Sequence, residues 1–153
     1  MTRGTTSRRE APAHPPRKAA TSAERHRALR AQHDSEAAQD YCEAIAELLD
    51  AGLEARVGRI AERFGLSHVT VSRVVRRLAT EGYVVARARA PLGLTPRGRE
   101  LATEARRRHE TVVAFLRAIG VDEPTAQADA EGIEHHVSPA TLRAMARVAR
   151  RGR

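Results

Sequence analysis

The chain has 153 residues, of which 41% are hydrophobic and only 3% aromatic, and it contains no Trp. A core made from so few aromatic side chains relies on Leu, Val, Ile and Ala, which suits packed helices better than a β-sandwich. The net charge is +8, and nearly all of the basic residues are Arg, whose planar group of donors matches phosphates and guanine edges. We therefore expect a mainly α protein with nucleic acid as its leading partner, and a basic surface that only aids solubility is the alternative.

The single cysteine, Cys42, excludes an intrachain disulfide and a zinc site made of several cysteines, and it fits a reducing compartment. No apolar run approaches the roughly 18 residues that a membrane span needs, and no apolar segment of a signal peptide follows Met1. These features predict a soluble, cytoplasmic protein that does not contact a membrane.

Residues 1–33 contain eight Arg or Lys against two Glu and almost no apolar periodicity. Such a segment buries too little apolar surface to offset its ordering entropy, so we expect a disordered basic arm. The sequence leaves open whether the arm adds nonspecific phosphate contacts or has no measurable role.

The pattern changes at Asp34. Either Asp34 or Ser35 can cap a helix whose apolar residues recur at helical spacing until Gly52. Residues 34–52 contain six acids and no base, whereas residues 53–99 contain ten Arg and three Glu. This segregation of charge predicts that the two regions do different jobs.

Two short helices in the Arg-rich region predict a helix-turn-helix. Apolar residues over 57–64 mark the first helix, and Gly65 provides a tight turn. Ser67 can cap the second helix, which runs until Gly82. The polar face of this second helix carries short side chains first and Arg later, as a recognition helix does.

Strand-prone residues follow the recognition helix. Residues 83–87 and 92–95 can pair across a turn at 88–91, which predicts a wing with Arg87 and Arg89 near its tip. A recognition helix places its N-terminal residues against base edges and its later ones against phosphates, so we expect base contacts from His68, Thr70 and Arg73. The predicted DNA-binding set is Ser67, His68, Thr70, Ser72, Arg73, Arg76, Arg77, Arg87 and Arg89.

The rest of the chain predicts three more helices. Pro96 opens a long one, Asp122 caps the next, and Ser138 with Pro139 begins the last. Three such helices can form a dimerisation bundle.

Acidic residues and histidines gather in two places that predict a cation site. Asp40 and Glu43 are three residues apart on the first helix, and Glu131, Glu134 and His135 have spacings of three and four on a later one. Packing like charges on one face costs free energy unless a cation neutralises them. A solvated acidic face is the alternative.

At this point the chain resembles the manganese-responsive branch of the DtxR family of metal-dependent transcriptional regulators. The resemblance covers residues 35–150 and is carried by Asp40-Tyr41-Cys42-Glu43, the helix-turn-helix over 66–83, Arg108-His109-Glu110 and the run 131–136 that ends Glu134-His135-His136. It implies the metal ligands Asp40, Glu43, His109, Glu131, Glu134 and His135. His136 would point about 100° away from His135 on a helix and is treated as a supporting residue.

The resemblance also implies which metal binds. Iron-responsive relatives carry Met where Asp40 stands and Cys where Glu131 stands, whereas this chain has hard oxygen donors at both positions. Oxygen donors favour Mn²⁺ by ligand type, and four carboxylates with two imidazoles suffice for two ions per chain. Fe²⁺ and other divalent ions are alternatives.

Three segments are therefore expected: a basic arm (1–33), a winged helix-turn-helix DNA-binding domain (34–95) and a helical metal-binding and dimerisation domain (96–153). The resemblance implies a homodimer that binds an operator in double-stranded DNA when loaded with Mn²⁺, represses manganese uptake genes and, as a second outcome, activates efflux genes. It implies no enzymatic activity and no organic substrate. Two alternatives are a winged-helix regulator that answers an organic ligand and a di-iron carboxylate enzyme.

Overall fold

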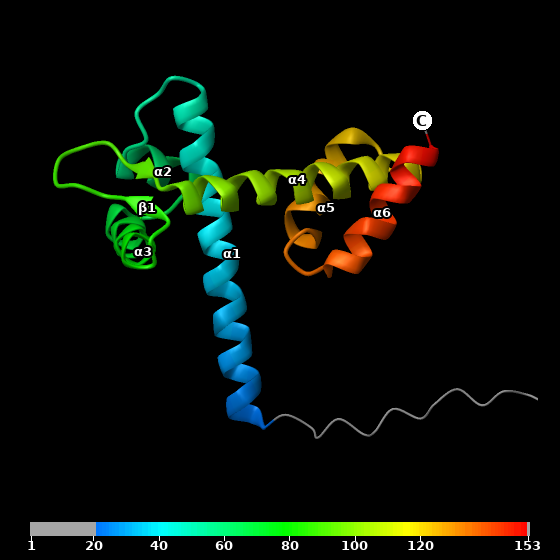
Figure 1. Cartoon of the computed structure of the whole chain (residues 1–153), viewed down its shortest axis with the longest axis horizontal. Helices are drawn as coiled ribbons and strands as arrows, with labels where there is room; N and C mark the ends of the chain where they lie inside the picture. The colour runs from blue at the N-terminus through cyan, green and yellow to red at the C-terminus, as the bar shows by residue number, and fades with distance from the viewer. Residues whose placement is uncertain (1–20, 153) are drawn as a thin grey trace, which may run out of the picture.

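The computed structural model describes residues 21–152. Along this part of the chain the order is helix α1, a helix-turn-helix, a short antiparallel hairpin and three further helices (Figure 1). This order confirms the predicted mainly α fold, with a winged helix-turn-helix followed by a helical domain. The elements are α1 (Ser22–Asp50), α2 (Val57–Phe64), α3 (His68–Thr80), β1 (Val84–Val85), β2 (Gly93–Leu94), α4 (Pro96–Ala118), α5 (Glu123–Ile133) and α6 (Pro139–Arg151).

The first lobe packs α1, α2, α3 and the hairpin around one aliphatic core. Gly65 joins α2 to α3 with φ of +63°, a left-handed conformation that favours glycine. Ser67 then caps α3, because its hydroxyl accepts a hydrogen bond from the backbone N–H of Thr70. The largest fully buried side chains of this core are Ile45, Ile60, Val71 and Leu78.

The predicted wing is present. β1 and β2 pair antiparallel, with Val84 opposite Leu94, and an isolated bridge joins Ala55 to Leu92. Arg89 adopts a φ of +60° in the turn between the strands, so the chain reverses sharply there. The wing therefore extends from the same lobe as α3, as a winged-helix DNA-binding unit requires.

A close backbone contact sets the angle at which α4 leaves the wing. Thr95 caps α4, because its hydroxyl accepts from the backbone N–H of Gly98 at 3.1 Å and donates to the carbonyl of Gly82 at 2.7 Å. A side chain at Gly98 would overlap the carbonyl oxygen of Tyr83. The absence of a Cβ at this position therefore lets α4 pack against the end of the wing.

The second lobe is a small helical unit built on the C-terminal half of α4. Helices α5 and α6 pack against α4 there, as Figure 1 shows. Its core is made of Val112, Val113, Leu116, Ala126 and Ala130. Helix α1 also packs on the N-terminal half of α4 through Cys42, Ala46 and Ala102. It faces the second lobe as well, because Asp40 of α1 lies 3.3 Å from His135.

The predicted boundary of the basic arm is wrong in part. Helix α1 begins at Ser22, twelve residues before Asp34, and residues 22–33 are helical. A reciprocal capping box at Thr21 and Glu24 starts the helix, and the Ala, Arg, Leu and Gln that follow are good helix formers. The boundary was predicted from the start of apolar periodicity. Residues 22–33 need no apolar face of their own to be helical, because they extend a helix whose later turns are packed. Residues 1–20 lie outside the described part of the chain.

Within the described residues, no helix is both long enough and apolar enough to cross a membrane.

Candidate metal centre and DNA-binding surface

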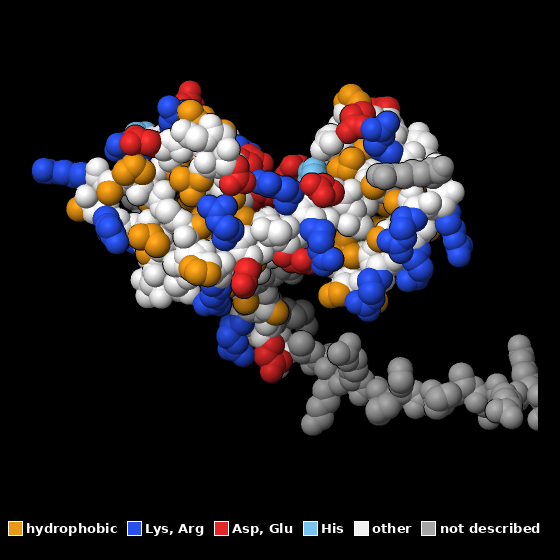
Figure 2. Space-filling view, turned by 45° about the horizontal axis from the view of Figure 1, so that its top comes forward, with side chains coloured by type: hydrophobic (Ala, Val, Ile, Leu, Met, Phe, Trp, Pro, Cys, Tyr) orange, Lys and Arg blue, Asp and Glu red, His pale blue; other side chains and the backbone are white. Residues whose placement is uncertain are grey.

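The six side chains predicted as metal ligands converge from three segments. Asp40 and Glu43 lie on α1, His109 lies on α4, and Glu131 lies on the last turn of α5. In Figure 2, acidic side chains and a histidine meet in the hollow between the two lobes. A cavity of about 330 Å³ opens there, lined by Asp40, Glu43, Ala44, Glu47, Arg63, Phe64, His109 and Glu131.

Glu134 and His135 lie just beyond α5, which ends at Ile133. The prediction placed both on the helix at spacings of three and four, and that detail is wrong, because Glu134 is the C-cap residue and His135 is in the turn that follows. The turn itself is held by Arg108 of α4, whose guanidinium donates to the backbone carbonyls of Glu134 and, at 3.0 Å, of Val137. Arg108 thus positions two predicted ligands without being one.

Glu134 is at the centre of the group. Its side chain is only 3% exposed, which makes it the one buried charged side chain among those that the structure describes. Its Oε2 hydrogen-bonds Nδ1 of His109 at 2.8 Å, and its Oε1 lies 3.5 Å from Nε2 of His135. Burial raises the pKa of Glu134, although the two histidines act in the opposite direction.

His109 has both ring nitrogens in contact with oxygen acceptors. Besides Glu134, its Nε2 hydrogen-bonds Oε1 of Gln127 at 2.8 Å, and Oε1 of Glu131 lies 3.7 Å from Nδ1. Burial alone would lower the pKa of His109, but the hydrogen bond to Gln127 and the two carboxylates outweigh it and raise the pKa. Gln127 was missed because only titratable groups were considered, although it lies four residues before Glu131 on the same helix face.

His135 connects the turn after α5 to α1. Its Nε2 lies 3.3 Å from Oδ1 of Asp40, and its Nδ1 hydrogen-bonds Oε1 of Gln39 at 3.3 Å. The bond to Asp40 raises the pKa of His135 more than burial lowers it. A predicted ligand of the first helix therefore contacts a predicted ligand of the second lobe directly.

Glu36 and His136 extend the group by one turn of α1. Nδ1 of His136 lies 3.6 Å from Oε1 of Glu36, and that buried carboxylate oxygen has no hydrogen-bond partner. Glu36 was not predicted as a ligand, although it lies four residues before Asp40, at the same helical spacing as the predicted acids. His136 is in the turn rather than on a helix, and its exposed side chain points to Glu36.

The donors fit a divalent cation, although they do not form a ready-made cage. Within the described part of the chain, no three His, Cys, Asp or Glu side chains surround one point closely enough to hold an ion as they stand. Burial and the charges of Glu134 and Glu47 raise the pKa of Glu43, which shows that the carboxylates crowd one another. Carboxylates and imidazoles are donors that Mn²⁺, Fe²⁺ and similar ions accept, and a bound cation would relieve this crowding after small side-chain movements.

The predicted DNA-binding residues of α3 differ in their exposure and in their contacts. His68, Arg73 and Arg76 are exposed, as the prediction requires. The hydroxyl of Ser67 is engaged with Thr70, both with its backbone N–H and, at 2.9 Å, with its side chain. Val69 was not among the predicted DNA-binding residues, yet it is 70% exposed at the start of α3.

Arg77 does not join this surface. Its Nη1 lies 2.8 Å from Oδ1 of Asp34 on α1 and 3.6 Å from Oε1 of Glu81. The side chain is therefore held against α1, whereas it was predicted to contact DNA because it is a basic residue on the polar face of α3. Only the packing of α1 beside α3 reveals this partner.

A groove of about 430 Å³ separates α3 from the wing. Arg76 of α3 and Arg87 and Arg89 of the wing line it, together with Ser72. Arg56, which precedes α2, also lines the groove and was not in the predicted set; it pairs with Glu54 at 2.7 Å. The structure thus brings the predicted wing residues beside the recognition helix and adds one more Arg.

Comparison with known proteins gives two adjacent family matches. Residues 34–90 match the N-terminal DNA-binding domain of iron-dependent repressors, and residues 95–151 match their metal-binding and dimerisation domain. The transcriptional regulator MntR of Salmonella typhimurium is 42% identical over 116 residues, which cover 76% of this chain and 74% of the relative. An HTH-type transcriptional regulator MntR of Lysinibacillus sphaericus is 41% identical over 100 residues, covering 65% of this chain and 72% of the relative.

Solved structures show the same fold. A manganese-dependent transcriptional repressor in complex with manganese aligns with a TM-score of 0.64 and 32% identity, over 75% of this chain and 52% of that one. The manganese regulator SloR aligns with a TM-score of 0.64 and 28% identity, over 72% and 52%. The chain therefore spans about half the length of these solved relatives and about three quarters of the sequence relatives.

Proposed function

Because the chain belongs to the DtxR family of metal-dependent transcriptional regulators, we propose that it is a Mn²⁺-dependent repressor that binds operator DNA as a homodimer. The matched relatives are transcriptional regulators, so the chain is a regulator and not an enzyme. Repression of manganese uptake genes is the proposed outcome, with activation of efflux genes as a second one. Divalent metal is the signal.

The observation that carries this proposal is the position of Glu134. This buried carboxylate contacts His109 and His135, and His135 in turn contacts Asp40 on α1. A buried carboxylate beside further acids is costly unless it is neutralised. We propose Asp40, Glu43, His109, Glu131, Glu134 and His135 as the ligands, with two ions per chain.

These residues connect the metal to DNA through α1. Asp40 lies on α1, which packs against α2 and α3, whereas Glu134 and His135 follow α5 in the second lobe. The charge of Glu134 raises the pKa of Glu43, so repulsion between these two carboxylates opposes the contact between α1 and the turn after α5 when no cation is bound. A bound divalent ion supplies the positive charge that removes this repulsion.

Once the lobes are held together, the two recognition helices of a dimer keep one separation. Half-sites of such dimers lie one helical turn of DNA apart, roughly 34 Å. DNA-binding lobes that already have this spacing lose less conformational freedom when they bind DNA, so the affinity for DNA rises. Four carboxylates among the six donors favour Mn²⁺ by ligand hardness, and Fe²⁺ is the main competitor.

Titration of chelator-stripped protein with Mn²⁺, followed by loss of the free-ion EPR signal, tests the metal part of the proposal. We expect about two bound ions per chain, as six donors allow. The double variant Glu131→Gln, Glu134→Gln should lose this binding. Glu100→Gln, Glu110→Gln, which removes two exposed acids of α4 with the same change in charge, is the control and should bind as the wild type does.

The competing hypothesis of an organic signal makes a different prediction. It requires DNA binding that a chelator does not change and an EPR titration with no tight sites. Either result would contradict the proposal.

A further inference from the structure

The first three turns of α1, residues 22–33, have no role in the proposed function so far. We call this segment the α1 extension. It projects past α3, away from both lobes (Figure 1), and the described side chains between Thr21 and Ser35 are all exposed. Helices in proteins gain most of their stability from packing, so an exposed extension that is capped at its start by Thr21 and Glu24 calls for a partner.

The α1 extension is basic. Residues 22–33 contain three Arg and two His against one acid, Glu24, and the carboxylate of Glu24 is already engaged in the capping box. A charged helix face of this kind matches an anionic partner and opposes the burial of the segment in an apolar interface.

Two of the basic residues, Arg27 and Arg30, also face a defined direction. Tyr41 of α1 points to α2, where its ring centroid lies 4.9 Å from that of Phe64. At about 100° per residue, the directions of Asp34, Arg30 and Arg27 fall within about 40° of that of Tyr41. The basic stripe of the extension therefore continues the face of α1 that carries the DNA-binding helices.

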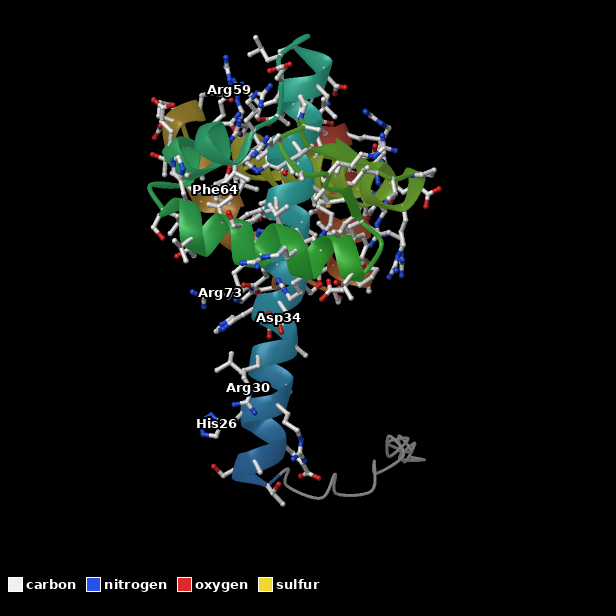
Figure 3. The ribbon with its side chains drawn as sticks, turned by 90° about the vertical axis from the view of Figure 1, so that its left-hand side faces the viewer. His26, Arg30, Asp34, Arg59, Phe64 and Arg73 are labelled. Carbon is white, nitrogen blue, oxygen red and sulfur yellow. The ribbon has the colours of Figure 1, made fainter. Side chains whose placement is uncertain are left out.

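An ion pair fixes this direction relative to the recognition helix. Asp34 pairs with Arg77 of α3 at 2.8 Å, and Arg77 also donates to the backbone carbonyl of Asp34 at 3.4 Å. In Figure 3, His26 and Arg30 extend to the same side of the molecule as Arg73 of α3. The extension and the exposed face of α3 thus border one space.

We propose that the α1 extension is a second DNA-contacting element, in which Arg27 and Arg30 bind phosphates flanking the groove read by α3. This inference rests on the proposed function, because it takes the partner of α3 to be duplex DNA. The extension is about 18 Å long at 1.5 Å per residue, comparable to half a turn of DNA. Arg27 and Arg30 are one helical turn apart, so both reach the same stretch of backbone.

The salt dependence of DNA affinity tests this inference. We would compare the wild type with Arg27→Gln, Arg30→Gln on a duplex of about 40 base pairs, long enough for two half-sites and their flanks, in Mn²⁺. Each lost phosphate contact reduces the slope of log K against log salt by about 0.9, so we expect a decrease of about 1.8 per bound protomer. Gln keeps the helix propensity, which circular dichroism verifies.

Two further variants separate contact from charge. Arg147→Gln, Arg151→Gln removes two exposed Arg at helical spacing on α6, far from α3, and should keep the wild-type slope. Arg27→Lys, Arg30→Lys keeps both charges and should also keep it. If the α1 and α6 variants lose the same amount of slope, the effect depends on net charge alone, and the inference is overturned.

The remaining outcomes distinguish this inference from the proposed function. Metal-dependent DNA binding by the wild type with an unchanged slope in Arg27→Gln, Arg30→Gln overturns the inference alone. A weaker dimer in sedimentation with an unchanged slope would give the extension a second copy of the chain as its partner, which also overturns it. No DNA binding by the wild type would refute both.

Discussion

Binding of Mn²⁺ should release about two protons per chain at mildly acidic pH. His109 contacts Glu134 and Gln127 through its two ring nitrogens, and His135 contacts Asp40 and Gln39 in the same way. An imidazole can donate from both nitrogens only when it is protonated, and the pKa of each histidine is raised above its ordinary value of 6.5. A metal ligand must give up that proton, so each histidine contributes one.

The sign and size of the effect follow from proton linkage. Metal affinity is fully developed above the raised pKa values and is lost as the pH falls through them. Below these values each obligatory proton weakens metal binding about 10-fold per pH unit. Calorimetry at about pH 6 in buffers of different ionisation enthalpy counts the protons directly.

A variant of the hydrogen-bond partner gives the internal control. Gln127→Ala removes an interaction that raises the pKa of His109, so the pH profile of metal affinity should move to lower pH. Gln32→Ala, an exposed Gln on the α1 extension, should leave the profile unchanged. A heat of binding independent of the buffer, or an affinity that is flat between about pH 6 and 8, would refute the reasoning.

Three further predictions concern single residues. Gly98→Ala should destabilise the protein by about 1–3 kcal/mol in urea denaturation, because the new methyl group overlaps the carbonyl oxygen of Tyr83. Gly132→Ala places a methyl group in open space on a helix and should stabilise the protein by about 0.5–1 kcal/mol. Equal effects of the two substitutions would contradict the packing argument. Val69→Ala should change the free energy of unfolding by less than about 0.5 kcal/mol, because the side chain is exposed. It should weaken DNA binding about fivefold, because the exposed side chain can contact thymine methyl groups. The loss of affinity should disappear on DNA with uracil in place of thymine. Cys42 is buried and its pKa is raised to about 11 by burial, so a thiol reagent at neutral pH should label it only as fast as the protein unfolds; rapid labelling of native protein would contradict this burial.

Most helix starts were predictable because they depend on local chemistry. Ser67, Asp122 and Ser138 each cap the helix that the sequence analysis assigned to them, since a side-chain oxygen beside an unsatisfied N–H needs no tertiary contact. The capping box at Thr21 and Glu24 follows the same rule and could have been predicted from the sequence. It was not predicted, because no apolar stripe follows it to indicate a helix. The end of α5 at Ile133 was less predictable, because no Gly or Pro follows it to mark the stop.

Most contacts of the candidate site could not be predicted from local sequence patterns. The spacing of Asp40 and Glu43 indicated a shared helix face, but only the resemblance to a family connected them with residues nearly a hundred positions away. Partners such as Gln127 for His109 depend on how α5 packs on α4, which no local pattern encodes. The same holds for Arg77, whose ion pair with Asp34 of α1 depends on how α1 packs beside α3.

The central claim is that a divalent metal bound between α1 and the second lobe raises DNA affinity. The most direct measurement is the dissociation constant for operator DNA, selected from a random duplex library, by fluorescence anisotropy in Mn²⁺ and in chelator. We expect the wild type to bind about 5–150-fold more tightly in Mn²⁺, the usual range of coupling between two sites, and Glu131→Gln, Glu134→Gln to lose that difference. Equal affinity of the wild type in Mn²⁺ and in chelator would contradict the account.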